Sequence, residues 1–270
     1  MKNKVVFITG ASSGIGKSIG EYLLKKGFVV YGTSRNPKKY TNTVFPLLEL
    51  DVSDENSIKK AVSQIIDKEK QLDILINNAG KGITGPVEET PIEEIKKAFD
   101  TNFFGVINVC KGVLPQMRKQ KNGLIINISS IAGYMGLPYR GIYSATKSAT
   151  SILSEVLSLE TKQFGITVVD VAPGDFATNI AAGRYHTPLF KNSNYKKHYS
   201  KVLKQINDEV DKGLQPEIMA KAIYKIITKK KPKVRYRVGT FMQRYAIHIK
   251  RLMPDRLYEK ILMKHYKLND

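Results

Sequence analysis

The strongest constraint on the fold is a repeated alternation between short apolar runs, rich in β-branched residues, and longer segments with helical periodicity. We predict seven strands, at residues 4–9, 28–33, 44–50, 72–77, 123–129, 166–172 and 234–238. Helices are predicted in the gaps, near residues 15–26, 54–70, 91–118, 143–164 and 216–229. This order indicates βαβ units, and nearly continuous apolar strands indicate a sheet that is covered on both faces. The sequence therefore predicts an α/β fold with a doubly wound, seven-stranded parallel sheet.

The regular pattern stops after Gly174. A polar stretch at about residues 175–213 is too long for an ordinary connection, so we expect it to form a lid over a substrate. Its tyrosines either form apolar walls of a site or pack a surface helix; they are Tyr185, Tyr195 and Tyr199. Residues 241–270 mix apolar and basic side chains at helical spacing. We predict one catalytic domain at residues 1–240, followed by a basic, amphipathic helical extension at 241–270.

Cysteine content and hydropathy exclude several classes of protein. Cys110 is the only cysteine, so the chain has no internal disulfide and no cysteine-based metal cluster. No apolar run reaches the 18 residues that suggest a membrane-spanning helix. We expect a cytoplasmic protein without a metal site.

The net charge of +20 is concentrated near the C-terminus, where residues 229–270 contain 13 Lys and Arg but only 3 Asp and Glu. Such a surplus is typical of proteins that contact nucleic acid or anionic membranes, and it also occurs on simple solvated faces. We expect no nucleic-acid partner, because no nucleic-acid motif accompanies the charge. For the tail, peripheral membrane contact, self-association and solvation all remain open.

A glycine-rich turn follows the first predicted strand and opens the first predicted helix. It reads Thr9-Gly10-Ala11-Ser12-Ser13-Gly14-Ile15-Gly16. Glycines let the backbone approach a pyrophosphate closely, and the free N–H groups of a helix N-terminus attract its charge. The turn is therefore a candidate dinucleotide site, with a purely structural loop as the alternative.

The end of the second predicted strand carries Ser34 and Arg35, at the place where NAD sites usually have an acidic residue. A guanidinium can pair with a 2′-phosphate in a fork geometry, whereas a carboxylate would repel it. We therefore expect NADP(H) rather than NAD. The alternative is that Arg35 is a solvent-exposed turn residue.

Tyr143 and Lys147 are four residues apart in a predicted helix, so they share one face, as many surface pairs also do. A tyrosine near its ordinary pKa of about 10 is a poor acid or base at neutral pH, but a nearby ammonium stabilises its phenolate. Three further clusters follow predicted strands: Ser129-Ser130, Asn77-Asn78-Ala79-Gly80 and Pro173-Gly174. The carboxyl ends of parallel strands meet at one edge, where ligands bind. The pattern predicts a catalytic site there.

In their order and spacing, these motifs closely resemble the short-chain dehydrogenase/reductase family, from residue 4 to about residue 180. The resemblance implies a Rossmann-like sheet and adds Asn102 to the candidates. It implies that Tyr143 gives or takes the proton and that Ser130 holds the substrate oxygen. Lys147 would lower the pKa of Tyr143 and bind the nicotinamide ribose, and Asn102 would hold a proton-relay water. Asn102 could instead satisfy backbone groups at a helix kink.

The resemblance also implies a set of cofactor contacts. Asp51 and Val52 would lie against the adenine, Asn78 and Ala79 beside the adenosine ribose, and Thr178 near the carboxamide. Asp51 could instead cap the helix that follows it. The full predicted set is Gly10, Ser12, Ser13, Gly14, Ile15, Gly16, Ser34, Arg35, Asp51, Val52, Asn78, Ala79, Gly80, Tyr143, Lys147, Pro173, Gly174 and Thr178.

The function predicted from these features is the NADPH-dependent reduction of a ketone or aldehyde to an alcohol. The pairs Ser12-Ser13 and Ser34-Arg35 resemble those of NADP-dependent hydroxysteroid, retinol and ketosphinganine reductases, which implies a lipophilic substrate. The alternatives are an NADP-linked sugar or polyol dehydrogenase and a non-catalytic NADP-binding regulator. Members of the family are commonly dimers or tetramers, so the resemblance also implies a homodimer or homotetramer.

Overall fold

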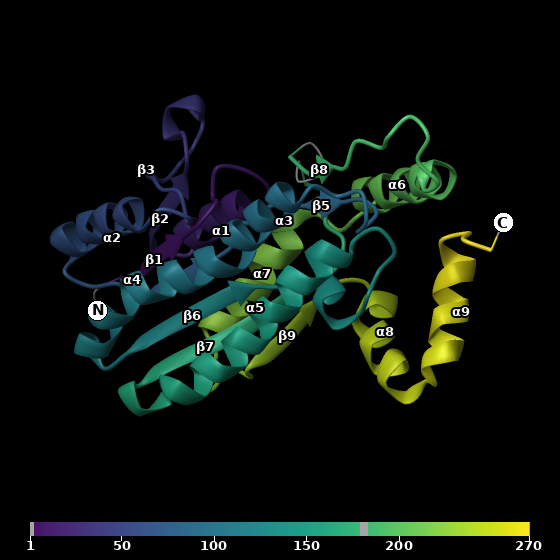
Figure 1. Ribbon diagram of the computed structural model, residues 1–270. Coiled ribbons are helices and arrows are strands. Elements are labelled where there is room, and N and C mark those ends of the chain that lie inside the picture. The colour runs from purple at the N-terminus through teal and green to yellow at the C-terminus, as the bar shows by residue number, and fades with distance from the viewer. Residues whose placement is uncertain (1–2, 179–182, 270) are drawn as a thin grey trace.

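Seven parallel strands form the central sheet of the protein (Figure 1). The computed structural model describes residues 3–178 and 183–269. The spatial order of the strands is β3-β2-β1-β4-β6-β7-β9, so the winding direction changes between β1 and β4. Their bounds are β1 Val5–Ile8, β2 Val29–Ser34, β3 Leu47–Glu49, β4 Ile74–Asn77, β6 Gly123–Ile128, β7 Ile166–Pro173 and β9 Arg235–Val238. The predicted fold class is confirmed, and a crevice is expected where the winding changes direction.

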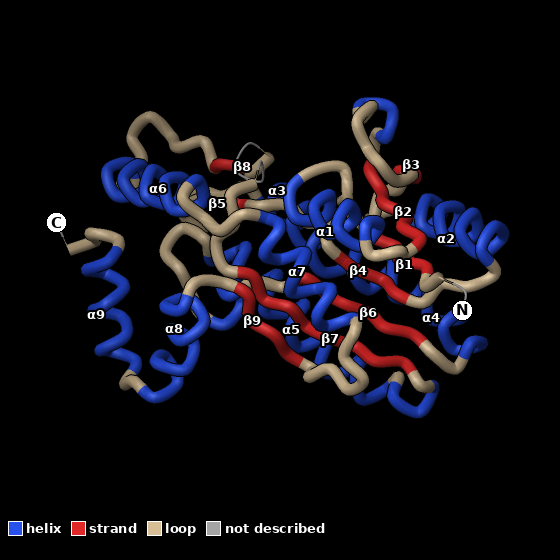
Figure 2. Tube along the Cα trace, turned by 180° about the vertical axis from the view of Figure 1, so that it is seen from behind, coloured by secondary structure: helices blue, strands red, loops and turns tan. Residues whose placement is uncertain are grey.

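Helices cover both faces of the sheet (Figure 2). One face carries α1 (Gly14–Lys25) and α7 (Pro216–Ile227), and the other carries α2 (Glu55–Glu69), α4 (Gly105–Gln120) and α5 (Gly141–Glu160). The central strand β1 contributes side chains to the apolar layers on both faces of the sheet, because successive side chains of a strand point to opposite faces. Val5 and Phe7 are fully buried in one apolar cluster, whereas Val6 and Ile8 are fully buried in the other.

The helix predicted at residues 91–118 is interrupted. It consists of α3 (Ile92–Phe99), a π-helical turn at Asp100–Phe104, and α4. A π-helical turn inserts an extra residue into a helix and is frequent at functional sites. Here it contains Asn102, which is fully buried.

The expected lid at residues 175–213 has more regular structure than the sequence suggested, although residues 179–182 lie outside the described residues. Strand β8 (Tyr185–His186) pairs with β5 (Ile83–Thr84), and α6 (Lys196–Asp211) follows. The apolar face of α6 is buried, with Tyr199 packed against Tyr139 at 5.2 Å between ring centroids. Tyr195 donates a hydrogen bond to Glu88. The contact with Tyr139 supports the packing alternative for Tyr199.

The predicted C-terminal extension forms two helices, α8 (Phe241–Leu252) and α9 (Asp255–His265), at one end of the molecule (Figure 1). A capping box between Thr240 and Gln243 begins α8, and Pro254 separates the two helices. Ile247 and Tyr266 anchor the extension through their buried side chains. Within residues 3–178 and 183–269, no helix has the length and apolar character that crossing a bilayer requires.

Candidate active site

A cleft of about 1110 Å³ lies at the carboxyl edge of the sheet, where the winding changes direction. Most of the predicted cofactor residues line it: Gly10, Ser12, Ser13, Gly14, Ile15, Ser34, Arg35, Asp51, Val52, Asn78, Ala79, Gly80, Tyr143, Lys147, Pro173 and Thr178. Gly16 and Gly174 lie elsewhere. A Cβ on Gly16 would be 2.5 Å from the Gly10 carbonyl oxygen, so Gly16 lets α1 pack on the turn.

The turn between β1 and α1 is held in place by Thr9, directly after β1, and by Asn78, directly after β4. Thr9 Oγ1 accepts hydrogen bonds from the backbone N–H groups of Asn78 and Ala79, each at 3.0 Å. Asn78 Nδ2 donates to the Gly10 carbonyl oxygen at 2.9 Å. Gly14 has a φ of +54°, and a Cβ there would lie 3.3 Å from Thr178 Cβ. A side chain at position 14 would therefore fill the space between the turn and Thr178, which we call the cradle.

The cradle fits a dinucleotide pyrophosphate. The first turn of α1, Gly14-Ile15-Gly16-Lys17, has no acidic side chain, so its positive dipole end is uncompensated. Within the described part of the chain, the Ser13 side chain makes no capping hydrogen bond, which leaves its hydroxyl to a ligand.

Arg35 is exposed at the edge of the cleft, immediately after β2. Ser34 Oγ accepts a hydrogen bond from the Asn36 backbone at 3.2 Å and so shapes the turn. Lys39 also lines the cleft, although we did not predict it from the sequence. The signal was a second cation four residues after Arg35, in a short turn that begins with Pro37.

Asp51 does not cap the following helix. Its carboxylate accepts a hydrogen bond from the Ser53 backbone at 2.9 Å, while Asp54 caps α2 by accepting from Asn56 at 2.8 Å. The capping alternative for Asp51 is therefore wrong, and Asp51 lies on the cleft wall.

Tyr143 and Lys147 lie near the start of α5, where both line the cleft and Tyr143 also lines a second cavity. Lys147 Nζ donates to the Ile128 carbonyl oxygen at 2.9 Å, and burial lowers the pKa of Lys147 to about 8. Burial raises the pKa of Tyr143, an effect opposed first by the charge of Arg140 and then by a hydrogen bond with Ser130. We expected Lys147 to lower this pKa, but Arg140 is the charge with the largest effect. The phenol stays protonated at neutral pH.

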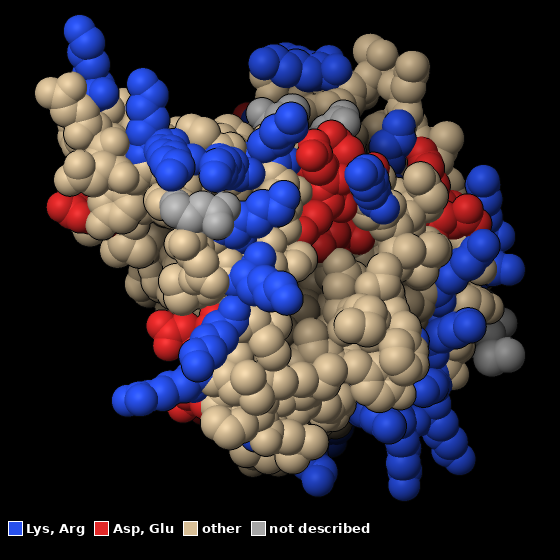
Figure 3. All heavy atoms as spheres, turned by 90° about the vertical axis from the view of Figure 1, so that its right-hand side faces the viewer, with Lys and Arg blue, Asp and Glu red and all other residues tan. Residues whose placement is uncertain are grey.

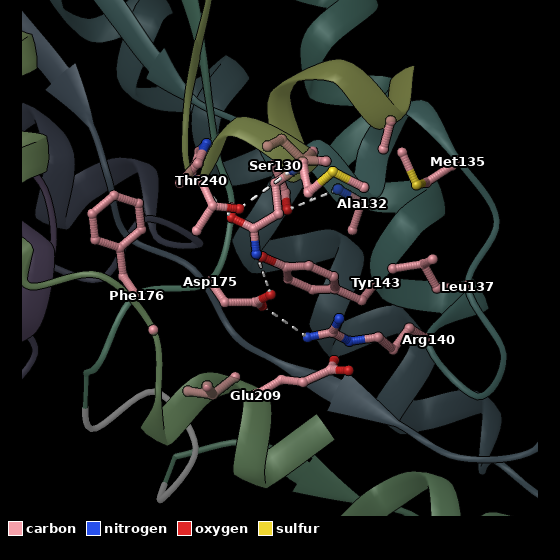
Figure 4. A pocket seen from close by; sticks show the side chains of 18 of the residues that line it. Ser130, Ala132, Met135, Leu137, Arg140, Tyr143, Asp175, Phe176, Glu209 and Thr240 are labelled. Carbon is pink, nitrogen blue, oxygen red and sulfur yellow. Dashed lines mark hydrogen bonds and ion pairs between the residues drawn. The ribbon is translucent and has the colours of Figure 1, made fainter. Parts of the chain in front are cut away.

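Ser130 caps a short 3-10 helix after β6, accepting from the Ala132 backbone at 3.1 Å. Its side chain and that of Tyr143 face the same cavity (Figure 4). The geometry thus brings a hydroxyl and a protonated phenol together.

The side-chain amide of Asn102 forms hydrogen bonds with other groups of the protein. Its Oδ1 accepts from the Lys81 backbone at 2.7 Å, and its Nδ2 donates to the Lys81 carbonyl oxygen at 2.9 Å and to Thr146 Oγ1 at 3.1 Å. The structure thus supports the alternative in which Asn102 satisfies backbone groups beside a helix irregularity. Its role with a proton-relay water stays a prediction.

A second cavity, of about 660 Å³, also has Tyr143 in its wall (Figure 4). Much of its wall comes from the C-terminal extension: Met242, Gln243, Ala246, Ile249, Met253, Tyr258, Ile261, Leu262, His265 and Tyr266. Met135, Leu137 and Phe176 add apolar surface near Tyr143. The extension is therefore part of a pocket, which none of the alternatives for the tail included.

Charged side chains gather at the Tyr143 end of this pocket (Figure 4). Arg140 Nη2 lies 3.7 Å from Asp175 Oδ1, and Gln243 donates to Asp175 Oδ2 at 2.7 Å. A Cβ on Gly174 would be 2.1 Å from Gln243 Oε1, so Gly174 makes room for this contact instead of lining the cofactor cleft. Sequence reasoning missed Asp175 and Gln243 because their contact joins residues 68 positions apart.

The fold and the site define an NAD(P)-dependent oxidoreductase built on a doubly wound sheet. The chain belongs to the short chain dehydrogenase family, whose characteristic sequence it matches over residues 4–188. It acts on the CH–OH group of a small molecule, with a nicotinamide nucleotide as the second substrate. This excludes the purely regulatory alternative.

Three similar proteins cover nearly the whole chain. A 3-ketodihydrosphingosine reductase of Bacteroides thetaiotaomicron is 43% identical over 99% of this chain and 100% of its own length. An NADPH-dependent 3-dehydrocapnine reductase of Ornithobacterium rhinotracheale is 34% identical over 96% of both chains. The crystal structure of a short-chain dehydrogenase from Streptomyces avermitilis superposes with a TM-score of 0.81 at 29% identity, covering 100% of this chain and 99% of that one.

Proposed function

We propose that this protein reduces the ketone of a long-chain amphiphile to an alcohol with NADPH, and that 3-ketodihydrosphingosine is the model substrate. The observation that carries the proposal is the pocket beside Tyr143, which is charged at the catalytic end and has an apolar wall along α8 formed by Met242, Ala246, Ile249 and Met253. A reductase that is 43% identical and bears that substrate's name supports it. The apolar wall disfavours the sugar or polyol alternative, because a hydrophilic substrate would not remove the apolar surface of that wall from water.

In the proposed mechanism, bound NADPH supplies the hydride, and the protein orients the carbonyl and provides the proton. Ser130 donates a hydrogen bond to the substrate oxygen and polarises the carbonyl. Tyr143 donates its phenol proton to the same oxygen, and burial favours this role because it keeps the phenol protonated. Lys147 would bind the nicotinamide ribose. The charge of Arg140, which has the largest effect on the pKa of Tyr143, and the Lys147 ammonium, held at the Ile128 carbonyl, would together stabilise the phenolate that the proton transfer leaves.

The charged end of the pocket would bind the polar head of the substrate. Asp175 offers a carboxylate to an amino group, and Arg140 offers N–H donors to a hydroxyl. The alkyl chain would lie along Ala246, Ile249 and Met253, where each buried methylene contributes about 0.8 kcal/mol of affinity.

The test is a turnover assay with purified protein. Oxidation of NADPH would be followed with 3-ketodihydrosphingosine, a short methyl ketone and a keto sugar, each against NADH as the alternative nucleotide. We expect kcat/KM to be highest for the long-chain ketone with NADPH. Preferred turnover of the keto sugar would overturn the assignment of the substrate.

Cofactor preference is expected to depend on Arg35. Replacing it by aspartate should lower the affinity for NADPH by about 10- to 100-fold, because a carboxylate repels the 2′-phosphate, while affinity for NADH changes little. Fluorescence titration of both nucleotides measures this. The matched control is Arg118→Asp, a change on α4 away from the cleft. Equal losses for NADH and NADPH would contradict the assignment of Arg35 to the 2′-phosphate.

Chain-length preference is expected to depend on the wall formed by α8. Ile249→Asp should raise KM for a long-chain ketone by about tenfold or more, since a carboxylate in the wall must lose water when an alkyl chain lies against it. KM for a short methyl ketone should stay nearly constant. Ile152→Asp, a change of an exposed isoleucine on α5, is the matched control. The same KM change for both ketones would show that Ile249 does not contact the chain.

A further inference from the structure

The C-terminal helices expose an unusual amount of apolar surface. Six large apolar side chains on α8 and α9 are exposed in addition to Met242: Phe241, Tyr245, Ile249, Leu252, Leu257 and Ile261. Leu252 is the extreme case, with 88% of its surface exposed. On each helix these residues recur at helical spacing, so they form one stripe on α8 and a shorter stripe on α9.

The two stripes are continuous with the substrate pocket. Met242, Ile249 and Ile261 are exposed and also line that pocket. The apolar surface therefore borders the pocket opening, and an alkyl chain could pass from this surface into the pocket along apolar side chains.

Basic residues flank the apolar stripes. Residues 241–269 contain seven Lys and Arg against Asp255 and Glu259. Six of the seven are exposed: Arg244, Arg251, Arg256, Lys260, Lys264 and Lys267. Figure 3 shows Lys and Arg side chains on both sides of a broad uncharged area on this end of the molecule. Apolar stripes with basic borders are typical of helices that lie in the interface of an anionic bilayer.

We propose that α8 and α9 dock on an anionic membrane surface, so that a lipid ketone enters the pocket directly from the bilayer. The proposal rests on the proposed function for the identity of the lipid, but docking itself does not depend on it. A second copy of this chain is the other candidate to cover the stripes. The membrane is favoured because a partner protein on this face would close the pocket opening, whereas a bilayer would supply the substrate through it.

The test is co-sedimentation of the full chain with vesicles of phosphatidylcholine alone or with about 30% phosphatidylglycerol. We expect at least tenfold stronger binding to the anionic vesicles, weakened by salt because the charges are exposed. Leu252→Asp and Leu257→Asp, which do not line the pocket, should each weaken binding about tenfold or more. Leu159→Asp, at a leucine that is 72% exposed on α5, is the matched control and should bind like the unmodified protein.

Activity measurements distinguish failure of the docking proposal from failure of the proposed function. Leu252→Asp should leave turnover of a dispersed short ketone unchanged and lower turnover of a vesicle-embedded ketone. Failure of the unmodified protein to bind anionic vesicles, or equal binding by Leu252→Asp, would overturn the docking proposal even if the ketone is reduced. If Leu252→Asp converts a dimer into a monomer in light scattering without changing vesicle binding, the stripes are a subunit interface instead. Vesicle binding without any turnover would sustain docking and reject the proposed function.

Discussion

Tyr143→Phe is expected to lower kcat by about 10³-fold while NADPH affinity changes by less than about threefold. The phenol is the proton donor in our mechanism, and removal of a positioned acid typically costs 10²- to 10⁴-fold in rate. The fold should be unaffected, because phenylalanine keeps the ring that packs at the start of α5. Stopped-flow oxidation of NADPH with a saturating ketone measures the chemical step, and fluorescence titration measures the affinity.

The control for this change is Tyr139→Phe, a neighbouring tyrosine whose ring packs against Tyr199. It should retain nearly full activity. A Tyr143→Phe variant that keeps more than a tenth of the rate would show that the proton comes from another group, with solvent as the first candidate.

Lys147→Met is expected to have opposite effects on activity and stability. Turnover should fall by about 10²- to 10³-fold, because the ammonium both orients the cofactor and stabilises the phenolate. Thermal stability should rise by a few degrees. Burial lowers the pKa of Lys147 from 10.5 to about 8, so below pH 8 the folded state holds a charge that the unfolded chain hydrates better. That shift corresponds to about 3 kcal/mol, partly offset by the lost hydrogen bond to Ile128, worth about 1 kcal/mol.

The stability gain expected for Lys147→Met depends on pH. Because the unfolded chain binds the Lys147 proton more tightly, the contribution of this residue to stability becomes less unfavourable as pH rises from about 8 to 10.5. Calorimetry between pH 7 and pH 10 should show the gain for Lys147→Met shrinking across that window. In the unmodified enzyme, kcat/KM should fall above about pH 8 as the amine loses its proton.

Lys162→Met, a change of an exposed lysine after α5, is the matched control. It should alter neither the midpoint of unfolding nor the rate. A Lys147→Met variant that is less stable than the unmodified protein at pH 7 would show that the hydrogen bond outweighs the cost of burying the charge.

The strands and the glycine-rich turn after β1 could be predicted because their signals are local. A strand buried on both faces needs a continuous apolar run, and a pyrophosphate turn needs glycine where φ is positive, as at Gly14. The third strand is shorter than predicted, at Leu47–Glu49, because Pro46 has no N–H to donate to the ladder. The π-helical turn around Asn102 was missed because helical periodicity does not register one inserted residue.

The sequence by itself determined the fold class, the dinucleotide turn and the candidate set of catalytic side chains, since each depends on residue types at fixed short spacings. Only the tertiary structure decided what surrounds them. It showed that Arg140 has the largest charge effect on the pKa of Tyr143, that Gln243 from the C-terminal extension holds Asp175, and that this extension forms a wall of the pocket beside Tyr143. These contacts join segments far apart in the chain. Their partners are selected by packing of the whole fold, which leaves no periodic pattern in the sequence.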